Sequence, residues 1–373
     1  LPANTGGKRR SLAIVERYLA RGDELILVAH DDGTADIAAL ERRGVKVISA
    51  RWKGGPERLV RGIAKGKSAI LGRFYTPELY RRARVIARMH PVDVLQIEYI
   101  HNCVYRDVAE AVRVLDLHDV ASEQARKIAA IQRPPLNALY WLESHALERR
   151  ERRAQSEYDV IACVSQHDRD LLGGRAHVAP NGWDATPPLG LPQGNQCAFV
   201  ANFAFSTNVD AAQWLVREIW PRVRAQVVDA QLWLVGKDPT PPVLALHGRD
   251  GVTVTGTVPD VAPYLERSRV ALAPLRAGSG SRLKILEALE ASRPMVVTTA
   301  GLEGLEALAN AGVLIADEPA AFAHAVVALL RDPARAQELG QQGRRAVHEA
   351  FLWDRTLAPM FDAIDRALAA RGH

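Results

Sequence analysis

Cysteines and aromatic residues are scarce in this chain. Only three of its 373 residues are cysteines, Cys103, Cys163 and Cys197, and aromatic residues make up 6%. Because the cysteines are widely spaced and odd in number, they do not predict a disulfide framework; they indicate buried thiols in a reducing compartment. No group of cysteines and histidines has the spacing of a zinc site, so the sequence predicts no zinc centre.

Long hydrophobic runs are also missing. No apolar stretch reaches the roughly 18 residues that a membrane-spanning helix needs, and the N-terminus lacks the apolar core of a secretory signal. We therefore expect a cytoplasmic protein. The sequence starts at Leu1, without a methionine, where the first strand of a sheet would be ending. We expect a short first strand to be missing there.

Strand-like and helix-like segments alternate along the chain. A length of 373 residues predicts about two domains, and the alternation favours parallel sheets with right-handed crossovers. Residues 184–196 are rich in proline and glycine, which indicates a linker. The last two helices, at 334–351 and 355–370, have no strand between them. Strands are expected at 24–29, 46–49, 94–97, 112–117, 160–164, 197–201, 231–235, 252–255, 270–273, 295–298 and 313–315.

A Gly/Ser-rich loop, residues 278–281, runs into a helix that starts with two cations. Free amides at a helix N-terminus bind anions, and the helix dipole favours negative charge there. Arg282 and Lys284 oppose that dipole, which an anionic ligand would explain; a solvated helix start is the alternative. The loop has neither the Walker pattern nor the dinucleotide fingerprint, since Leu283 replaces the third glycine.

This segment resembles the donor site of retaining glycosyltransferases of family 4. Glu287 matches the family's second glutamate, which binds the ribose, while Ser279 replaces the first glutamate, which contacts the transferred sugar. A subgroup of the family has a G-[ST]-R-x-K loop here. The resemblance implies that Arg282 and Lys284 hold the diphosphate, together with the loop residues Gly278, Gly280 and Ser281.

Further segments resemble the same family in the same order. Residues 2–10 resemble its P-x-x-x-G-G-x-x-R loop, which contains Gly6 and Gly7. The other matching segments are Val114–Asp119, Val178–Asp184 and Glu303–Leu305. The resemblance implies the α/β GT-B fold, with two Rossmann-like parallel-sheet domains facing a central cleft. We expect an acceptor domain at 1–185, a nucleotide-sugar donor domain at 186–352 and, at 353–373, a helix crossing back to the first domain.

The resemblance also implies roles for individual residues. His118 is expected to act at the catalytic centre with Ser279, Arg282 and Lys284, by positioning the donor sugar and the acceptor. Glu98 and Asp119 are expected to contact the acceptor. Val258 and Pro259 are expected to line the base pocket. The co-substrate would be a nucleotide-diphosphate sugar, without a metal or another cofactor.

Positive charge is concentrated in one region. Residues 42–88 contain fourteen lysines and arginines and two acids, although the whole chain has a net charge of only +5. Four arginines fall on an expected helix around 77–89 beside apolar residues, which is typical of binding to an anionic membrane surface. A solvated face or an anionic acceptor are the alternatives. Nucleic acid is not expected, because the region lacks interleaved aromatics and a reader motif.

Three functions remain open at this point. The first is a retaining, metal-independent hexosyltransferase acting on a bacterial envelope polysaccharide or a lipid-linked glycan, peripheral at the inner face of the plasma membrane. The second is a tailoring enzyme that glycosylates a small natural product. The third is a non-catalytic binding or partner subunit, because Ser279 departs from the family pattern and residues 202–208 lack the cations that many family members have there.

Overall fold

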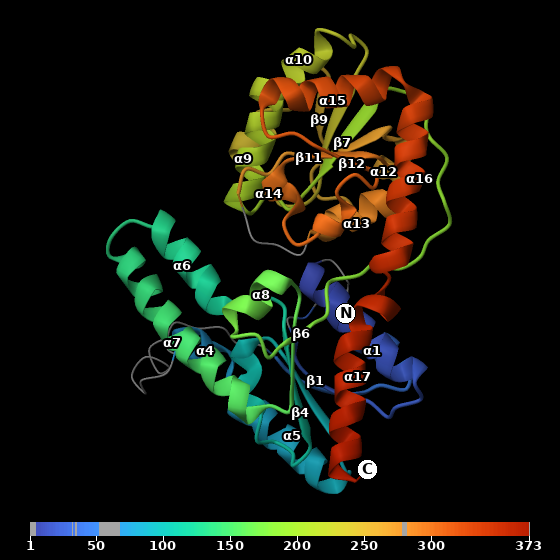
Figure 1. Cartoon of the computed structure of the whole chain (residues 1–373). Helices are drawn as coiled ribbons and strands as arrows, with labels where there is room; N and C mark the ends of the chain where they lie inside the picture. Colours follow the sequence, from blue (N-terminus) through green and yellow to red (C-terminus); the bar gives the residue numbers. More distant parts are fainter. Residues whose placement is uncertain (1–4, 32, 34–35, 52–67, 278–281, 373) are drawn as a thin grey trace. The chain divides into compact units, whose positions relative to one another are not determined.

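The computed structural model describes residues 5–31, 33, 36–51, 68–277 and 282–372 (Figure 1). The chain divides into two compact units. Unit 1 consists of Leu1–Asn181 and Asp354–His373, and unit 2 consists of Gly182–Trp353. The C-terminal helix therefore belongs to the same unit as the N-terminal sheets.

Unit 1 contains two parallel sheets covered by helices. One sheet pairs β1 with β2, and the other has the order β3-β4-β5-β6. Strand β4 is buried on both faces apart from the half-buried Arg113, as is typical of an interior strand in a parallel sheet. The elements are α1 (Gly6–Ala20), β1 (Ile26–Asp31), α2 (Ile37–Arg42), β2 (Lys46–Arg51), α4 (Ala69–Phe74), α5 (Pro77–Met89), β3 (Val94–Glu98), η1 (Ile100–Tyr105), β4 (Val112–Leu117), α6 (Ala121–Ile131), α7 (Leu136–Glu157), β5 (Val160–Cys163), α8 (Gln166–Leu171), β6 (His177–Val178) and α17 (Trp353–Arg371).

Unit 2 contains one six-stranded parallel sheet with helices on it. The strand order is β12-β11-β10-β7-β8-β9, which is the order of a Rossmann fold numbered from the first strand of the unit. The elements are β7 (Gln196–Val200), α9 (Ser206–Trp214), η2 (Leu215–Ile219), α10 (Trp220–Arg224), β8 (Gln231–Val235), α11 (Pro241–Leu244), β9 (Val252–Val254), α12 (Ala262–Arg267), β10 (Val270–Ala273), α13 (Leu283–Glu290), β11 (Met295–Val297), α14 (Thr299–Leu302), η3 (Glu306–Leu308), β12 (Val313–Ile315), α15 (Pro319–Arg331) and α16 (Pro333–Ala350).

Local signals explain several helix starts. Prolines stand in the first turn of α5, α15 and α16, where a missing N–H costs nothing. Asp332 caps α16 by accepting a hydrogen bond from the Arg335 amide at 3.0 Å. The stretch 206–224, expected as one helix from 209, is instead interrupted by the π turn η2 just before Pro221. Proline cannot donate to a carbonyl of the preceding turn, and the π turn accommodates that loss.

The N-terminal glycine segment differs from its expected form. The sequence predicts a loop through Gly6 and Gly7, whereas the structure begins α1 at Gly6. Thr5 caps this helix, because its hydroxyl accepts a hydrogen bond from the Lys8 amide at 3.3 Å. The loop interpretation was wrong for these two residues because the capping signal of Thr5 outweighs the low helix propensity of glycine.

Candidate functional site

The sheet order of unit 2 places a binding site at its centre. Crossovers run outward from β7 toward β9 and from β10 toward β12, so the chain turns away in opposite directions at the β7–β10 pair. Open α/β sheets bind ligands beyond the carboxyl ends of strands at such a switch point. Here those ends lead to residues 201–205 and the first turn of α9, and to the start of α13.

Lys284 and Asn208 meet at this switch point. Lys284 Nζ lies 3.2 Å from Asn208 Oδ1 and 5.4 Å from the centre of the Phe199 ring. The Asn208 amide donates in turn to the Asn202 carbonyl at 2.8 Å, which fixes its orientation. Burial, and secondarily the charge of Arg282, lowers the pKa of Lys284 to about 7. Within the described residues Lys284 forms no ion pair, so an anion near Nζ would relieve the cost of burying it.

Arg282, at the start of the same helix, contacts a different segment of the chain. It adopts a left-handed backbone with φ 48°, which is strained for a residue other than glycine. Its guanidinium donates to the Ala300 carbonyl at 2.8 Å and lies 3.4 Å from the Glu303 carboxylate. Burial lowers the pKa of Arg282. The side chain therefore ties the start of α13 to the segment after β11.

The other residues that the sequence predicts to bind the donor belong to α13, to the segment after β9 and to the loop that precedes α13 in the sequence. Glu287 is half-buried on α13, one turn after Leu283. Val258 and Pro259 follow the edge strand β9, two strands from β7. The loop residues Gly278, Ser279, Gly280 and Ser281 lie outside the described residues.

A glycine allows the chain after β8 to approach the chain after β7 closely. Gly236 follows β8 with φ 144°, and a Cβ there would lie 1.8 Å from the Ala201 carbonyl oxygen. Only glycine fits such a backbone approach. The Phe203 amide then donates to the Lys237 carbonyl at 3.0 Å. These contacts fix the path of the chain from β7 to Asn208.

Unit 1 gathers a histidine and two carboxylates at the carboxyl ends of β3 and β4. Glu98 and Asp116 are neighbours in the parallel register, and His118 follows β4. His118 Nε2 lies 2.7 Å from Glu98 Oε2 and 3.2 Å from Asp116 Oδ2. Burial acts to lower the pKa of His118, but the hydrogen bonds to Asp116 and Glu98 outweigh it and raise the pKa to about 9. The imidazole is therefore held as a cation at neutral pH.

The second nitrogen of this histidine remains available. His118 Nδ1 is buried and has no hydrogen-bond partner among the residues that the structure describes, while the side chain as a whole is 6% exposed. A Cβ on Gly7 would lie 3.3 Å from it, so Nδ1 faces the start of α1. A buried N–H without a partner is costly. A ligand oxygen at this point would satisfy it.

A buried ion pair holds α1 against β4. Arg10 donates to Asp116 from Nε and Nη2, each at 2.7 Å, and both side chains are fully buried. Arg10 Nη1 also donates to the Ala179 carbonyl at 2.8 Å. Burial acts to raise the pKa of Asp116, but Arg10 outweighs it and holds the pKa well below its usual range. Arg10 is the arginine of the P-x-x-x-G-G-x-x-R segment, but the sequence did not predict its pairing with Asp116.

Glu98, Asp116 and His118 could in principle hold a metal ion. Their ligand atoms lie within 4.8 Å of one another, the only such group among the residues that the structure describes. However, both Asp116 oxygens already accept hydrogen bonds from Arg10. A metal ion here would meet a guanidinium, so the donor set fits an ion-pair cluster better than a metal site.

Tyr99 forms one wall of the cluster. It has a positive φ of 64°, and its ring lies 3.9 Å from that of His118 and 5.1 Å from that of His101, centre to centre. A Cβ on Gly7 would lie 1.8 Å from the Tyr99 hydroxyl oxygen, so the close approach requires glycine. Strained residues of this kind gather at functional sites. Burial lowers the pKa of His101 to about 3, so this ring is neutral.

Asp119 is bound to the neighbouring helix. Its Oδ2 accepts a hydrogen bond from Gln124 on α6 at 2.9 Å. Burial raises its pKa. Of the two acceptor residues expected from the sequence, Glu98 therefore contacts His118 directly, whereas Asp119 contacts α6.

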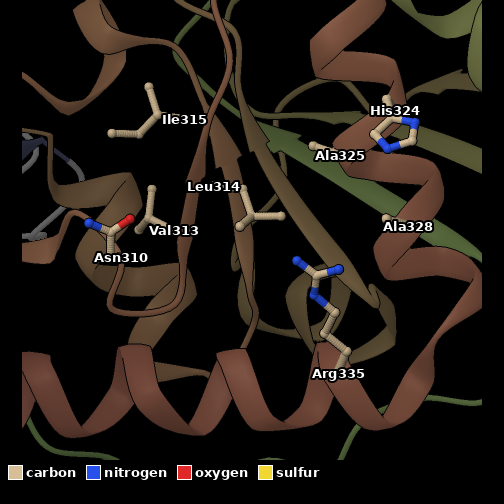
Figure 2. Close-up of a pocket in the computed structure, with 8 residues that line it drawn as sticks. All are labelled: Asn310, Val313, Leu314, Ile315, His324, Ala325, Ala328 and Arg335. Atoms are coloured by element: carbon tan, nitrogen blue, oxygen red, sulfur yellow. The ribbon is translucent and has the colours of Figure 1, made fainter.

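Another pocket lies away from these residues. It encloses about 370 Å³ beside the edge strand β12 (Figure 2). Figure 2 shows the Arg335 side chain extending from α16 toward Leu314, with His324 on the opposite helix. β11 separates this edge from β10. The pocket therefore takes no part in the switch-point site.

The basic region is only partly described. Residues 52–67 of the expected basic stretch lie outside the described residues. On α5, Arg81, Arg84 and Arg88 are exposed, together with Val85 at 53% and Met89 at 70%. None of the described helices is both long and apolar enough to cross a membrane.

Comparison with known proteins gives one family match, which lies in unit 2. Residues 194–332 match the family described as glycosyl transferases group 1. The matched residues lie within unit 2. The match spans both partners at the switch point, Asn208 and Lys284. A comparison with curated proteins gave no match.

Solved structures match nearly the whole chain. Sucrose-phosphate synthase from Thermosynechococcus elongatus has a TM-score of 0.69 at 18% identity, covering 97% of this chain and 92% of its own. WaaG, a glycosyltransferase involved in lipopolysaccharide biosynthesis, has a TM-score of 0.66 at 15% identity, covering 97% and 96%. Anabaena HepE, solved with UDP and glucose, has a TM-score of 0.63 at 14% identity, covering 98% and 97%. These likenesses confirm the predicted α/β GT-B fold.

Proposed function

We propose that this chain is a glycosyltransferase that moves a hexose from a nucleotide-diphosphate sugar to an acceptor. The observation that carries the proposal is Lys284, a half-buried side chain whose amine forms no ion pair among the described residues, at the switch point of a domain that matches the group 1 family model. A diphosphate supplies the negative charge that this position lacks. HepE, which has the same fold, was solved with UDP and glucose.

The proposed reaction retains the configuration of the sugar, as the family 4 resemblance implies. The bond between the sugar C1 and the diphosphate oxygen breaks, and the acceptor oxygen bonds to C1 on the same face. The acceptor proton passes to the leaving phosphate. Negative charge grows on that phosphate, so Lys284 and the amides at the start of α13 stabilise the transition state. No metal is required for this step.

The cluster around His118 has a positioning role in this proposal. His118 Nδ1 donates to a hydroxyl of the transferred sugar or the acceptor, because it is the unsatisfied nitrogen. Glu98 acts through His118, since its Oε2 binds the imidazole and its Oε1 accepts from Gln96 at 2.7 Å. Asp119 lies beside this centre and is proposed to contact the acceptor. On the donor side, Glu287 would bind the ribose.

We propose a bacterial envelope polysaccharide or a lipid-linked glycan as the acceptor, reached from the inner face of the plasma membrane. The exposed arginines of α5 and the likeness to WaaG support this choice. A tailoring enzyme for small natural products would instead act on soluble aglycones and would not need a membrane.

Donor binding tests the proposal directly. Calorimetry with UDP, GDP, dTDP and their sugars should identify one nucleotide that binds the wild-type protein. The Lys284→Ala variant should bind it about tenfold or more weakly, because a charged hydrogen bond to phosphate is lost. Arg267→Ala, which removes an exposed cation on α12, is the matched control and should bind normally.

A measurement of turnover distinguishes an enzyme from a non-catalytic binding subunit. The wild-type protein should slowly hydrolyse the bound nucleotide sugar or transfer its sugar to an acceptor extract. Binding without any turnover would support the non-catalytic alternative. Binding that is unchanged by Lys284→Ala would contradict the proposed site.

A further inference from the structure

Strand β3 carries two polar side chains on one of its faces. Parallel strands with both faces covered are usually near-continuous apolar runs, yet β3 contains Gln96 and Glu98. Side chains two residues apart point to the same face of a strand, so these two are neighbours. Leu95 and Ile97, on the opposite face, belong to the hydrophobic core of unit 1. The polar face is the one that α1 contacts, through the side chains described next.

A chain of hydrogen bonds runs along this face to His118. The Tyr18 hydroxyl, on α1, donates to Gln96 Oε1 at 2.7 Å. Gln96 Nε2 donates to Glu98 Oε1 at 2.7 Å. His118 Nε2 donates to Glu98 Oε2, also at 2.7 Å. Gln96 therefore joins a buried tyrosine to the carboxylate that contacts the histidine.

The protons of this chain have one favourable arrangement. Burial raises the pKa of Tyr18 well above its usual value, so the hydroxyl keeps its proton and can donate. The Gln96 oxygen then faces Tyr18, and its NH2 group faces Glu98. The opposite orientation of the amide would place the oxygens of Gln96 and Glu98, both acceptors, against each other. Tyr18 and Gln96 together thus present a donor to Glu98.

Three donors surround the Glu98 carboxylate. Besides Gln96 and His118, the Ser11 hydroxyl of α1 donates to Glu98 Oε2 at 3.1 Å. Oε2 thus accepts two hydrogen bonds and Oε1 accepts one. Although the Glu98 side chain is 25% exposed, these contacts hold it in one orientation. A carboxylate held in this way can fix the orientation of the ring that it contacts.

Stability alone does not account for this polar face. Apolar residues of similar volume would pack there as well, since buried polar groups contribute little net free energy. The Tyr18 ring packs edge to face on Phe361 of α17, at 4.8 Å between ring centres, which holds the tyrosine in place. The other end of the chain is the imidazole of His118, whose Nδ1 has no hydrogen-bond partner among the described residues. Fixing the Nε2 contact therefore fixes the direction in which Nδ1 points.

We propose that Gln96 and Tyr18 are positioning residues for His118. Acting through Glu98, they hold the imidazole ring so that its Nδ1–H is directed at a hydroxyl of the sugar or the acceptor. The effect on turnover rests on the proposed function, whereas the effect on the ring does not. The two effects are therefore tested separately.

NMR of the unliganded protein tests the effect on the ring. In protein with isotope-labelled histidine, the Nε2 proton of His118 should give a protected signal, identified by its absence in His118→Gln. Gln96→Leu should lose this signal through exchange with water, because Glu98 is no longer held beside the ring. Gln96→Met, which keeps the length of the side chain without its donor, should behave in the same way.

A matched control exists for this substitution. Gln155→Leu also removes a half-buried amide of unit 1, but the side chain of Gln155 has no hydrogen-bond partner among the described residues. This control should keep the His118 signal. A signal that persists unchanged in Gln96→Leu and Gln96→Met would overturn the proposal, and so would its loss in Gln155→Leu.

Steady-state kinetics test the effect on turnover. With the nucleotide sugar that binds the wild type, Gln96→Leu should lower kcat about tenfold and leave KM within about twofold, because an oriented hydrogen bond in the transition state is weakened. Tyr18→Phe should lower kcat about threefold, since the amide loses one of its two contacts. Tyr158→Phe is the control, because it removes a buried hydroxyl that has no partner among the described residues, and it should leave kcat unchanged.

The double variant shows whether the two residues act in one chain. Tyr18→Phe with Gln96→Leu should be no slower than Gln96→Leu alone, because Tyr18 acts only through the amide. Losses that add in the double variant, or a loss of the NMR signal with unchanged kcat, would overturn the positioning role. If the signal responds as expected but no nucleotide sugar is turned over, the hydrogen-bond chain is supported and the proposed function is the part that fails.

Discussion

Binding of a nucleotide-diphosphate sugar should transfer a proton from solution to Lys284. Burial lowers the pKa of this amine to about 7, against an ordinary value of 10.5. At pH 8 the free protein therefore holds only about one-tenth of a proton on Nζ. A diphosphate beside the amine favours its charged form. The complex would hold nearly a full proton, so binding at pH 8 should take up about 0.9 proton.

The same linkage sets the direction of the pH dependence. Below pH 7 Lys284 is charged in the free protein, so affinity should change little with pH. Above pH 7 the free amine loses its proton, and affinity should fall by about tenfold for each pH unit until the raised pKa of the complex is reached. Between pH 6 and pH 9 the predicted loss is about 100-fold.

Calorimetry in two buffers with different ionisation enthalpies measures the uptake. The ligand should be a nucleotide sugar, because its diphosphate has no group that titrates near neutrality. His118 adds little, since with a pKa of about 9 it is already about nine-tenths protonated at pH 8. The Lys284→Met variant should bind the nucleotide sugar weakly and without proton uptake. The Arg267→Ala variant should keep both the affinity and the proton uptake of the wild type. Wild-type binding at pH 8 without proton uptake, or uptake that persists in Lys284→Met, would refute this reasoning.

Two further predictions concern unit 1. Arg10→Met should lower the free energy of unfolding by about 3–5 kcal/mol in urea denaturation, because it leaves Asp116 buried without its partner. Adding Asp116→Leu should recover part of that loss, and a single variant as stable as the wild type would contradict the buried pair. Gly7→Ala should lower the melting temperature, because the new methyl group meets the Tyr99 hydroxyl. Adding Tyr99→Phe should partly restore the melting temperature. An unchanged melting temperature in Gly7→Ala would show that Gly7 and the Tyr99 hydroxyl lie farther apart than in this structure.

Hydrophobic patterning predicted most of the strands. Those at 112–117, 231–235, 270–273 and 313–315 have the bounds that the structure shows. These strands are short runs of branched apolar residues between turn signals, which parallel sheets with two covered faces require. The predicted secondary structure was wrong where local signals compete, as at the capped start of α1 at Gly6 and at the π turn before Pro221.

Contacts at the candidate sites could not be predicted in the same way. The lack of cations at residues 202–208 is visible in the sequence, but the hydrogen bond from Lys284 to Asn208, in the first turn of α9, is not. The buried Arg10–Asp116 pair joins residues 106 positions apart. The partners of Arg282 likewise come from a segment about 20 residues away. No local pattern encodes such pairs.

The sequence by itself determined the alternation of strands and helices, the two-domain organisation expected from it and the cations at the start of α13. These follow from local periodicity and composition. Only the tertiary structure decided which of those residues meet. Strand order brought Lys284 to Asn208, and parallel register brought Glu98 beside Asp116 and His118. Burial then changed their chemistry, because a charge removed from water depends on the few groups that remain within reach.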